Sequence, residues 1–254
     1  MEQASEQSSP LHLLDPRVKL IVTLLFVIFV LSLPLEDLPC LILFFIYPIV
    51  SCASAGIAYG GVFKRSLIVL PFIVFIGVFN PLIHRQVVFC IGGVGITSGW
   101  ISFISILIRG IISVQAVIIL ILTTGFYNIC RGMGRMGIPS LLTTQLLFVY
   151  RYISVLLQEA LSMDYARAAR SFGKKSYSCK MWGLFVGQLL LRTMERSERI
   201  YRAMLSRGFN GSIEGSFHFV WRMRETVYLV VWTSLFVFLK LCSPIHLLNS
   251  FINL

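Results

Sequence analysis

Long apolar blocks separated by short polar segments dominate the pattern along the chain. A helix needs roughly 20 apolar residues to cross a bilayer, and five blocks approach that length, at about residues 18–33, 38–59, 66–83, 101–124 and 226–241. Residues 87–100 are rich in glycine and β-branched residues, which favours a short hairpin or a re-entrant segment. The pattern therefore predicts an all-α polytopic membrane protein with about five transmembrane helices and long cytoplasmic helices.

Positive charge is concentrated between the fourth and the last apolar block. Residues 131–224 hold 15 of the 22 lysines and arginines but only 5 of the 11 acids, so this stretch carries +10 of the total net charge of +11. The positive-inside rule places such a stretch in the cytoplasm, and an alternating topology then puts the N-terminus there too. We expect three parts: residues 1–130 with four spans, the basic region 131–224, and a last span with its tail at 225–254.

Composition excludes several classes of function. Only 13% of the residues are charged, against roughly 25% in a soluble domain, which argues against a soluble enzyme and against a nucleic-acid partner. The six cysteines form no CxxC pair and the four histidines lack metal-ligand spacing, so we expect no metal site and no cofactor. There is no P-loop motif for ATP and no recognisable catalytic triad. The N-terminus lacks the basic start of a signal peptide, so we expect the first apolar block to be retained.

The basic region contains two predicted long helices, at residues 141–172 and 181–207. Each has an arginine in its last turn, Arg170 or Arg207, and a glycine stop after it, Gly173 or Gly208. An arginine at a helix tip presents a rigid set of donors to a carboxylate, so two tips suit two acidic sites on paired partner subunits. The alternative is that these arginines only complement the helix dipole or contact anionic lipids. A role in partner binding requires both tips to lie outside the hydrocarbon and on one side of the bilayer.

At these residues the sequence resembles the CbiQ/EcfT family, the transmembrane T components of energy-coupling factor (ECF) importers, and its cobalt-type branch most closely. The longest similar stretch is ERSERIYRAMLSRGFNG at residues 195–211, which is similar to the family's ExAxRVYxAMxARGF block. Shorter similar segments are LDPRVKL at 14–20, LPF at 70–72, FNP at 79–81, MGIP at 136–139 and YRY at 150–152. The resemblance covers nearly the whole chain.

The resemblance implies which residues contact the partner subunits. Two Ala-Arg-Gly motifs in the family end the coupling helices, and each docks in a groove of one ATPase subunit. The second motif is similar to Ser206, Arg207 and Gly208, with serine in place of alanine. The first is aligned with Ala169, Arg170 and Ser171, with serine in place of glycine; the alternative first docking residue is Arg167.

The resemblance also implies a role in transport. The chain would act as the energy-coupling permease subunit of an ABC-type importer in the bacterial inner membrane. Its partners would be ATP-binding subunits and a substrate-binding S component within the bilayer, and the substrate would be cobalt or nickel ions. A T component of a vitamin importer is the alternative. A membrane enzyme acting on lipid or prenyl substrates is the alternative from another class, but it needs a cluster of acids or histidines that the sequence does not offer.

Two further features lie in the apolar blocks. Ser51, Ala55, Gly56 and Gly60 repeat small residues at helical spacing, which predicts either close helix packing within the chain or a contact with the S component. Arg109 lies within the fourth block, where an arginine is costly and is usually paired or functional. It is expected to reach the interface, a backbone carbonyl or another subunit.

Overall fold

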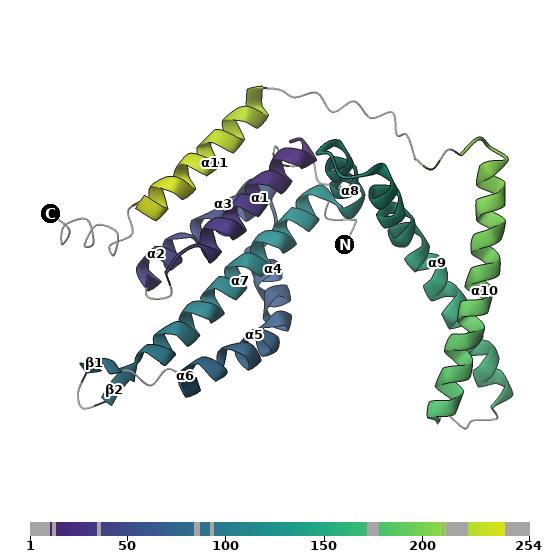
Figure 1. Ribbon diagram of the computed structural model, residues 1–254, viewed down its shortest axis with the longest axis horizontal. Coiled ribbons are helices and arrows are strands. Elements are labelled where there is room, and N and C mark those ends of the chain that lie inside the picture. The colour runs from purple at the N-terminus through teal and green to yellow at the C-terminus, as the bar shows by residue number, and fades with distance from the viewer. Residues whose placement is uncertain are drawn as a thin grey trace. The chain divides into compact units, whose positions relative to one another are not determined.

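The described chain is helical apart from one hairpin, which confirms the predicted all-α class of a polytopic membrane protein (Figure 1). The computed structural model describes residues 11, 14–34, 37–83, 87–91, 94–171, 178–209, 211 and 223–241. The helices before the hairpin are α1 (Pro16–Leu31), α2 (Leu38–Leu43), α3 (Ile46–Ala55), α4 (Tyr59–Ser66), the short 3₁₀ turn η2 (Leu67–Val69), α5 (Leu70–Gly77) and α6 (Phe79–Ile83). The hairpin, β1 (Val87–Ile91) and β2 (Val94–Thr97), is followed by α7 (Ser98–Thr124), α8 (Phe126–Arg135), α9 (Ser140–Arg170), α10 (Cys179–Leu205) and α11 (Met223–Leu241).

Contacts within the chain divide it into two compact units. The first unit holds Met1–Gly132 and Phe219–Leu254, and therefore contains α1 to α7 and α11. The second unit holds Met133–His218, and therefore contains the two longest helices of the basic region, α9 and α10. Each unit has its own internal packing and is described by itself below.

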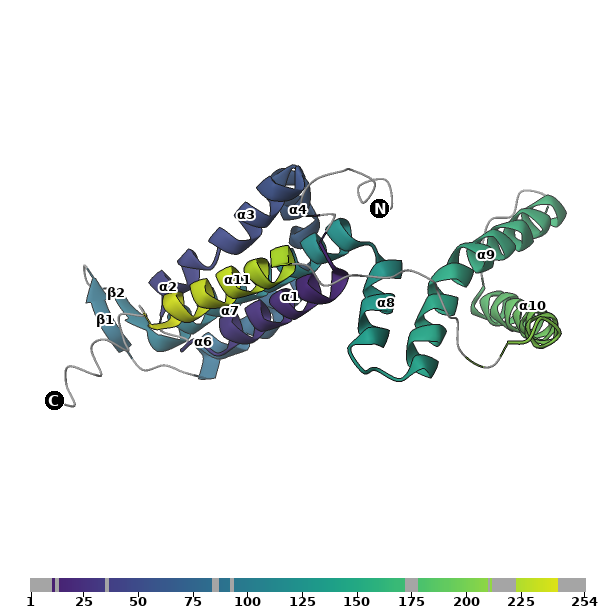
Figure 2. The same ribbon diagram turned by 90° about the horizontal axis from the view of Figure 1, so that it is seen from above.

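Helix α7 is the centre of the first unit, since α1, α3, α4, α5 and α6 all pack against it (Figures 1 and 2). A cluster of buried apolar side chains, with aromatic rings among them, joins α1, α2, α3 and α11 beside it. Phe26 of α1 stacks on Tyr47 of α3 with ring centroids 4.4 Å apart, and it meets Phe236 of α11 at 5.3 Å. These large rings fix how α11, which is distant in sequence, packs on α1.

The start of α1 is tied to the end of α7 by polar contacts. The Asp15 carboxylate accepts a hydrogen bond from the backbone N–H of Arg17 at 2.9 Å, which is an N-cap, and Pro16 follows in the first turn. The buried Lys19 ammonium donates to the backbone oxygen of Thr123 at 3.3 Å, in the last turn of α7. A cation suits that position because a helix ends with unpaired carbonyl groups and a partial negative charge.

The segment after α6 forms a hairpin. Strand β1 pairs with β2 in antiparallel register, with Ile91 opposite Val94 and Cys90 opposite Gly95. Of the two structures that the glycine-rich sequence allowed, the structure contains the hairpin.

Four described helical stretches are long and apolar enough to cross a membrane: Leu38–Ala55, Tyr59–Pro81, Gly99–Thr124 and Ser140–Arg170. The first three correspond to expected blocks. The expected first and last blocks are not among them, because α1 has 16 residues, about 24 Å of helix, against a hydrocarbon core of roughly 30 Å, and α11 carries Arg224, Glu225 and Lys240. The fourth stretch is α9, which the charge distribution assigned to the cytoplasmic region.

Candidate functional site

Helices α9 and α10 form an antiparallel pair that contains the predicted docking arginines (Figure 1). The Phe148 ring, near the start of α9, lies 6.3 Å from the Phe209 ring, just past the end of α10. The Arg207 tip therefore lies beside the first half of α9, whereas Arg170 is 22 residues beyond Phe148, roughly 33 Å along the helix. Two tips so far apart cannot share one acceptor, but they suit two separate ones.

The end of α10 has a well-formed glycine cap. Gly208 has a φ of +79°, in the left-handed region where glycine is favoured. Its N–H donates to the oxygen of Leu205 at 3.0 Å, and the N–H of Phe209 donates to the oxygen of Met204 at 3.0 Å. This pair of bonds is a Schellman motif, which ends the helix sharply. The predicted stop at Gly208 is confirmed, and Arg207 lies exposed immediately before it.

The end of α9 is closed by a serine. The backbone N–H and the Oγ of Ser171 both donate to the oxygen of Ala168, at 3.2 and 3.0 Å. Arg170 and Ala169 are exposed on the last turn. The glycine stop expected at Gly173, with its two following lysines, lies outside the described residues. The first tip therefore has the same plan as the second: an exposed arginine at the closing turn of a long helix.

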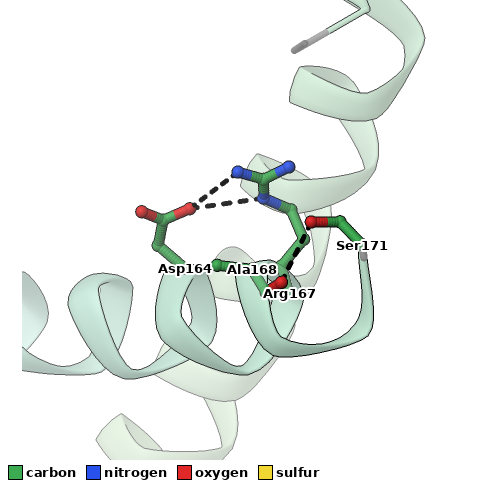
Figure 3. A network of polar contacts seen from close by, with 4 residues as sticks. All are labelled: Asp164, Arg167, Ala168 and Ser171. Carbon is green, nitrogen blue, oxygen red and sulfur yellow. Dashed lines mark hydrogen bonds and ion pairs between the residues drawn. The ribbon is translucent and has the colours of Figure 1, made fainter. Parts of the chain in front are cut away.

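The alternative first docking residue, Arg167, is engaged within its own helix. Its Nη2 and Nε donate to one oxygen of Asp164 at 3.2 and 3.3 Å, three residues back in the sequence (Figure 3). Among the described residues, neither Arg170 nor Arg207 makes a side-chain hydrogen bond or ion pair. Two of the three candidate arginines therefore present a guanidinium that is open to an outside carboxylate.

A carboxylate that the sequence analysis did not single out joins the two helices. One carboxylate oxygen of Glu159, on α9, accepts a hydrogen bond from Nη1 of Arg192 at 2.8 Å. Its other oxygen lies 3.7 Å from Nη1 of Arg196. The two arginines are four residues apart on α10 and so lie on one face. The sequence shows an acid within the basic region and, separately, two arginines at helical spacing. It does not show that the helices containing them pack side by side, so the contact could not be predicted.

A cavity of about 910 Å³ lies between the two helices. Its walls are mainly apolar side chains of both helices, Leu141, Phe148, Tyr152, Met194, Tyr201 and Met204 among them. The rings of Phe148 and Phe209 line it, and so does Arg196, which faces Glu159.

The small residues predicted as a contact face do not form a single helix face. Ser51 and Ala55 are buried on α3 within the first unit, so their small size serves packing inside the chain. Gly56 ends α3 with a φ of +70°, and Gly60 follows the break as an exposed residue of α4. The spacing was that of one helix, but the left-handed residue interrupts it.

Arg109 finds its partner inside the chain. Its Nη2 donates to the backbone oxygen of Pro34 at 2.6 Å, and it lies in the electrostatic field of the buried Asp37. Of the alternatives drawn from the sequence, a backbone carbonyl is the one found. All four histidines lie outside the described residues, within which no group of three or more His, Cys, Asp or Glu side chains could hold a metal.

Comparison with known proteins supports the relation inferred from the motifs. A sequence model of the CbiQ family, described as a cobalt transport protein, matches residues 7–219. An uncharacterized protein of Methanocaldococcus jannaschii is 27% identical over 241 residues, which cover 90% of this chain and 81% of that protein. A second uncharacterized protein of the same organism is 29% identical over 104 residues, covering 40% of this chain and 38% of the relative.

Proposed function

The chain belongs to the CbiQ family of cobalt transport proteins, and from that premise we propose that it is the T component of an ECF-type importer. It is a membrane transport component, a permease rather than an enzyme. In the proposed role it links ATP hydrolysis on partner subunits to the movement of a substrate-binding S component in the bilayer.

The observation that carries this proposal is the pair of open arginines at the two helix tips. Arg170 and Arg207 are both exposed, and both stand at the negative end of a long helix. A guanidinium there has its five donors available for a carboxylate in a groove of an ATP-binding subunit. Arg167 is the weaker candidate, because docking through it would first have to break its pair with Asp164.

The proposal requires α9 to lie along the cytoplasmic face and not to cross the membrane. Because the two tips lie at opposite ends of the antiparallel pair, a membrane-crossing α9 would put them on opposite sides of the bilayer. Its polar second half, which begins at Glu159, supports the surface location. So does α10, whose arginines Arg192 and Arg196 would have to enter hydrocarbon beside α9 at a large cost.

The substrate of the proposed importer is a cobalt or nickel ion, which would be bound by the S component. The family's description as a cobalt transport protein supports a metal over a vitamin. Recovery of a vitamin-binding S component with this chain would change the substrate but would leave the coupling role in place.

Reversal of charge at each tip tests the proposal. Arg170→Glu and Arg207→Glu should each lower uptake of radioactive cobalt or nickel at least tenfold and reduce co-purification of the ATP-binding subunits in mild detergent. Membrane insertion should not change, because both side chains are exposed. Arg199→Glu is the matched control, since Arg199 is an exposed arginine of α10 that is not at its tip.

Two results would contradict the proposal. Full uptake by Arg207→Glu would remove the docking role of the tip. A purified wild-type protein that recovers no ATP-binding subunit, under conditions in which it stays folded, would remove the T-component role altogether. Loss of uptake through Arg167→Glu, with Arg170→Glu active, would move the first docking site to Arg167.

A further inference from the structure

Glu159 of α9 contacts Arg192 and Arg196 of α10 and so joins the two helices. The two helices must move as one body, or in a fixed relation, if a force on one tip is to reach the other. Their side chains give little help, because α10 has no fully buried residue and α9 has only Thr143 and Thr144. The cavity of about 910 Å³ is lined by side chains of both helices.

Within the described residues, the ion pairs that join α9 to α10 all involve Glu159. Two other ion pairs in the described part of the second unit, Asp164 with Arg167 and Glu198 with Arg202, each lie within one helix. Glu159 is about one-quarter exposed and uses both of its carboxylate oxygens on guanidinium groups. A partly buried carboxylate with two cationic partners is held more firmly than an isolated surface pair.

The Glu159 contact lies some distance along each helix from its arginine tip. Arg170 lies 11 residues beyond Glu159, about 16 Å along α9, and Arg207 lies 15 residues beyond Arg192, about 22 Å along α10. A small rotation at the contact therefore becomes a larger displacement at each tip. Because Arg192 and Arg196 are four residues apart, both face Glu159 at once and hold α10 to α9 at two points.

We propose that Glu159 is a positioning residue that fixes α9 to α10 and thereby couples the movement of the two arginine tips. This inference rests on the proposed function for its role in transport, but its structural part does not. Loss of the carboxylate leaves both tips intact for docking and lets the helices move independently. ATP hydrolysis then continues, and the work that it performs no longer reaches the S component.

The first test measures transport per ATP in the purified complex reconstituted in liposomes. Glu159→Gln should keep ATP hydrolysis within about twofold of wild type and lower cobalt or nickel uptake per ATP at least tenfold. The matched control is Glu198→Gln, which removes an exposed pair within α10 and should leave the ratio unchanged. An unchanged ratio in Glu159→Gln, or an equal loss in Glu198→Gln, overturns the proposal.

The second test needs no partner and separates this inference from the proposed function. Spin labels on Tyr165→Cys and Leu205→Cys, two exposed positions on α9 and α10, are placed in a chain whose six native cysteines have been replaced. Glu159→Arg should broaden the distance distribution between the labels. Adding Arg192→Glu and Arg196→Glu should restore a narrow one, which a merely steric role would not.

The outcomes are distinct. The proposal is wrong if the distance distribution between the labels stays narrow in Glu159→Arg. It is also wrong if the added Arg192→Glu and Arg196→Glu substitutions do not narrow the distribution again. Both results hold whatever the chain transports. A complex that hydrolyses no ATP and takes up no metal in its wild-type form contradicts the proposed function, while the spin-label result still decides whether Glu159 holds the two helices together.

Discussion

The guanidinium of Arg109 donates a hydrogen bond to the backbone oxygen of Pro34 at 2.6 Å and so ties the middle of α7 to the turn after α1. The same side chain lies close enough to the buried Asp37 for their charges to interact. An arginine inside an apolar helix is usually a sign of a substrate path or a subunit contact. Here Pro34 and Asp37 give it two interactions within the chain.

Substitution of Arg109 tests this structural assignment. Arg109→Gln should lower the free energy of unfolding by about 1–3 kcal/mol, because a charged hydrogen bond is lost and Asp37 loses a nearby cation. Arg109→Lys should recover part of the loss. Unfolding in a mixed-micelle denaturant titration measures the effect.

The control for that experiment is Arg65→Gln, which changes an exposed arginine at the end of α4. It should leave stability within about 0.5 kcal/mol of wild type, as surface substitutions usually do. If Arg109→Gln is as stable as the control but defective in uptake, the structural assignment is wrong. Contact with a partner subunit is then the better explanation of Arg109.

Substitution of two glycines, one within α10 and one at its end, by alanine should change stability in opposite directions. Gly208→Ala puts a side chain at a φ of +79° and should destabilise the end of α10 by roughly 1–2 kcal/mol. Gly187→Ala lies in the interior of the same helix with nothing within 4 Å of the new methyl group, and it should stabilise the helix by up to about 1 kcal/mol. Hydrogen exchange of the last turn of α10 measures the first effect and thermal unfolding the second. Equal protection of that turn in both variants would contradict the cap assignment.

Close packing of α5 on α7 depends on another glycine. A methyl group on Gly110 would lie 2.6 Å from Cδ1 of Ile73, and 3.1 Å from its Cγ2, so Gly110→Ala should destabilise the first unit by about 1–3 kcal/mol. Ile73→Val removes the nearest atom and should restore part of the stability in the double variant. Gly61→Ala, which meets nothing within 4 Å, is the control. Additive losses in the double variant would show that the two residues do not press on each other.

The orientation of α9 can be measured with thiol reagents. In a chain that lacks its six native cysteines, Ala169→Cys and Ser206→Cys place single exposed thiols beside the two tips. We expect a membrane-impermeant maleimide to label both in inside-out vesicles and neither in right-side-out vesicles. Labelling of the two from opposite sides would mean that α9 crosses the bilayer, and the docking proposal would then be wrong.

Much of this architecture could be predicted from local sequence. The two long helices of the basic region, the cap at Gly208 and the hairpin between β1 and β2 follow from apolar periodicity and from the conformations that glycine allows. Three expected apolar blocks also match stretches that can cross a membrane. Local spacing did not show the backbone break at Gly56, whose left-handed conformation ends α3 and places Gly60 on the next helix.

The candidate site was predicted only in part, because contacts between side chains decide which arginines are available. An arginine at the end of a helix can be located from sequence, but its availability depends on neighbours one turn away. Arg167 and Arg170 each follow an alanine near the end of α9. Arg167 forms an ion pair with Asp164, whereas Arg170 is exposed. The structure thus shows that the two candidates differ in their side-chain contacts, which the alignment of motifs could not show.

By itself the sequence determined the class of this protein, its helical segments and the chemical character of its basic region, because these depend on short-range periodicity and composition. Only the tertiary structure decided that Glu159 meets Arg192 and Arg196, that Arg109 donates to Pro34, and that the two tips lie at opposite ends of an antiparallel pair. These contacts join residues 33 to 75 positions apart. Their formation depends on how helices pack, and no local pattern encodes that.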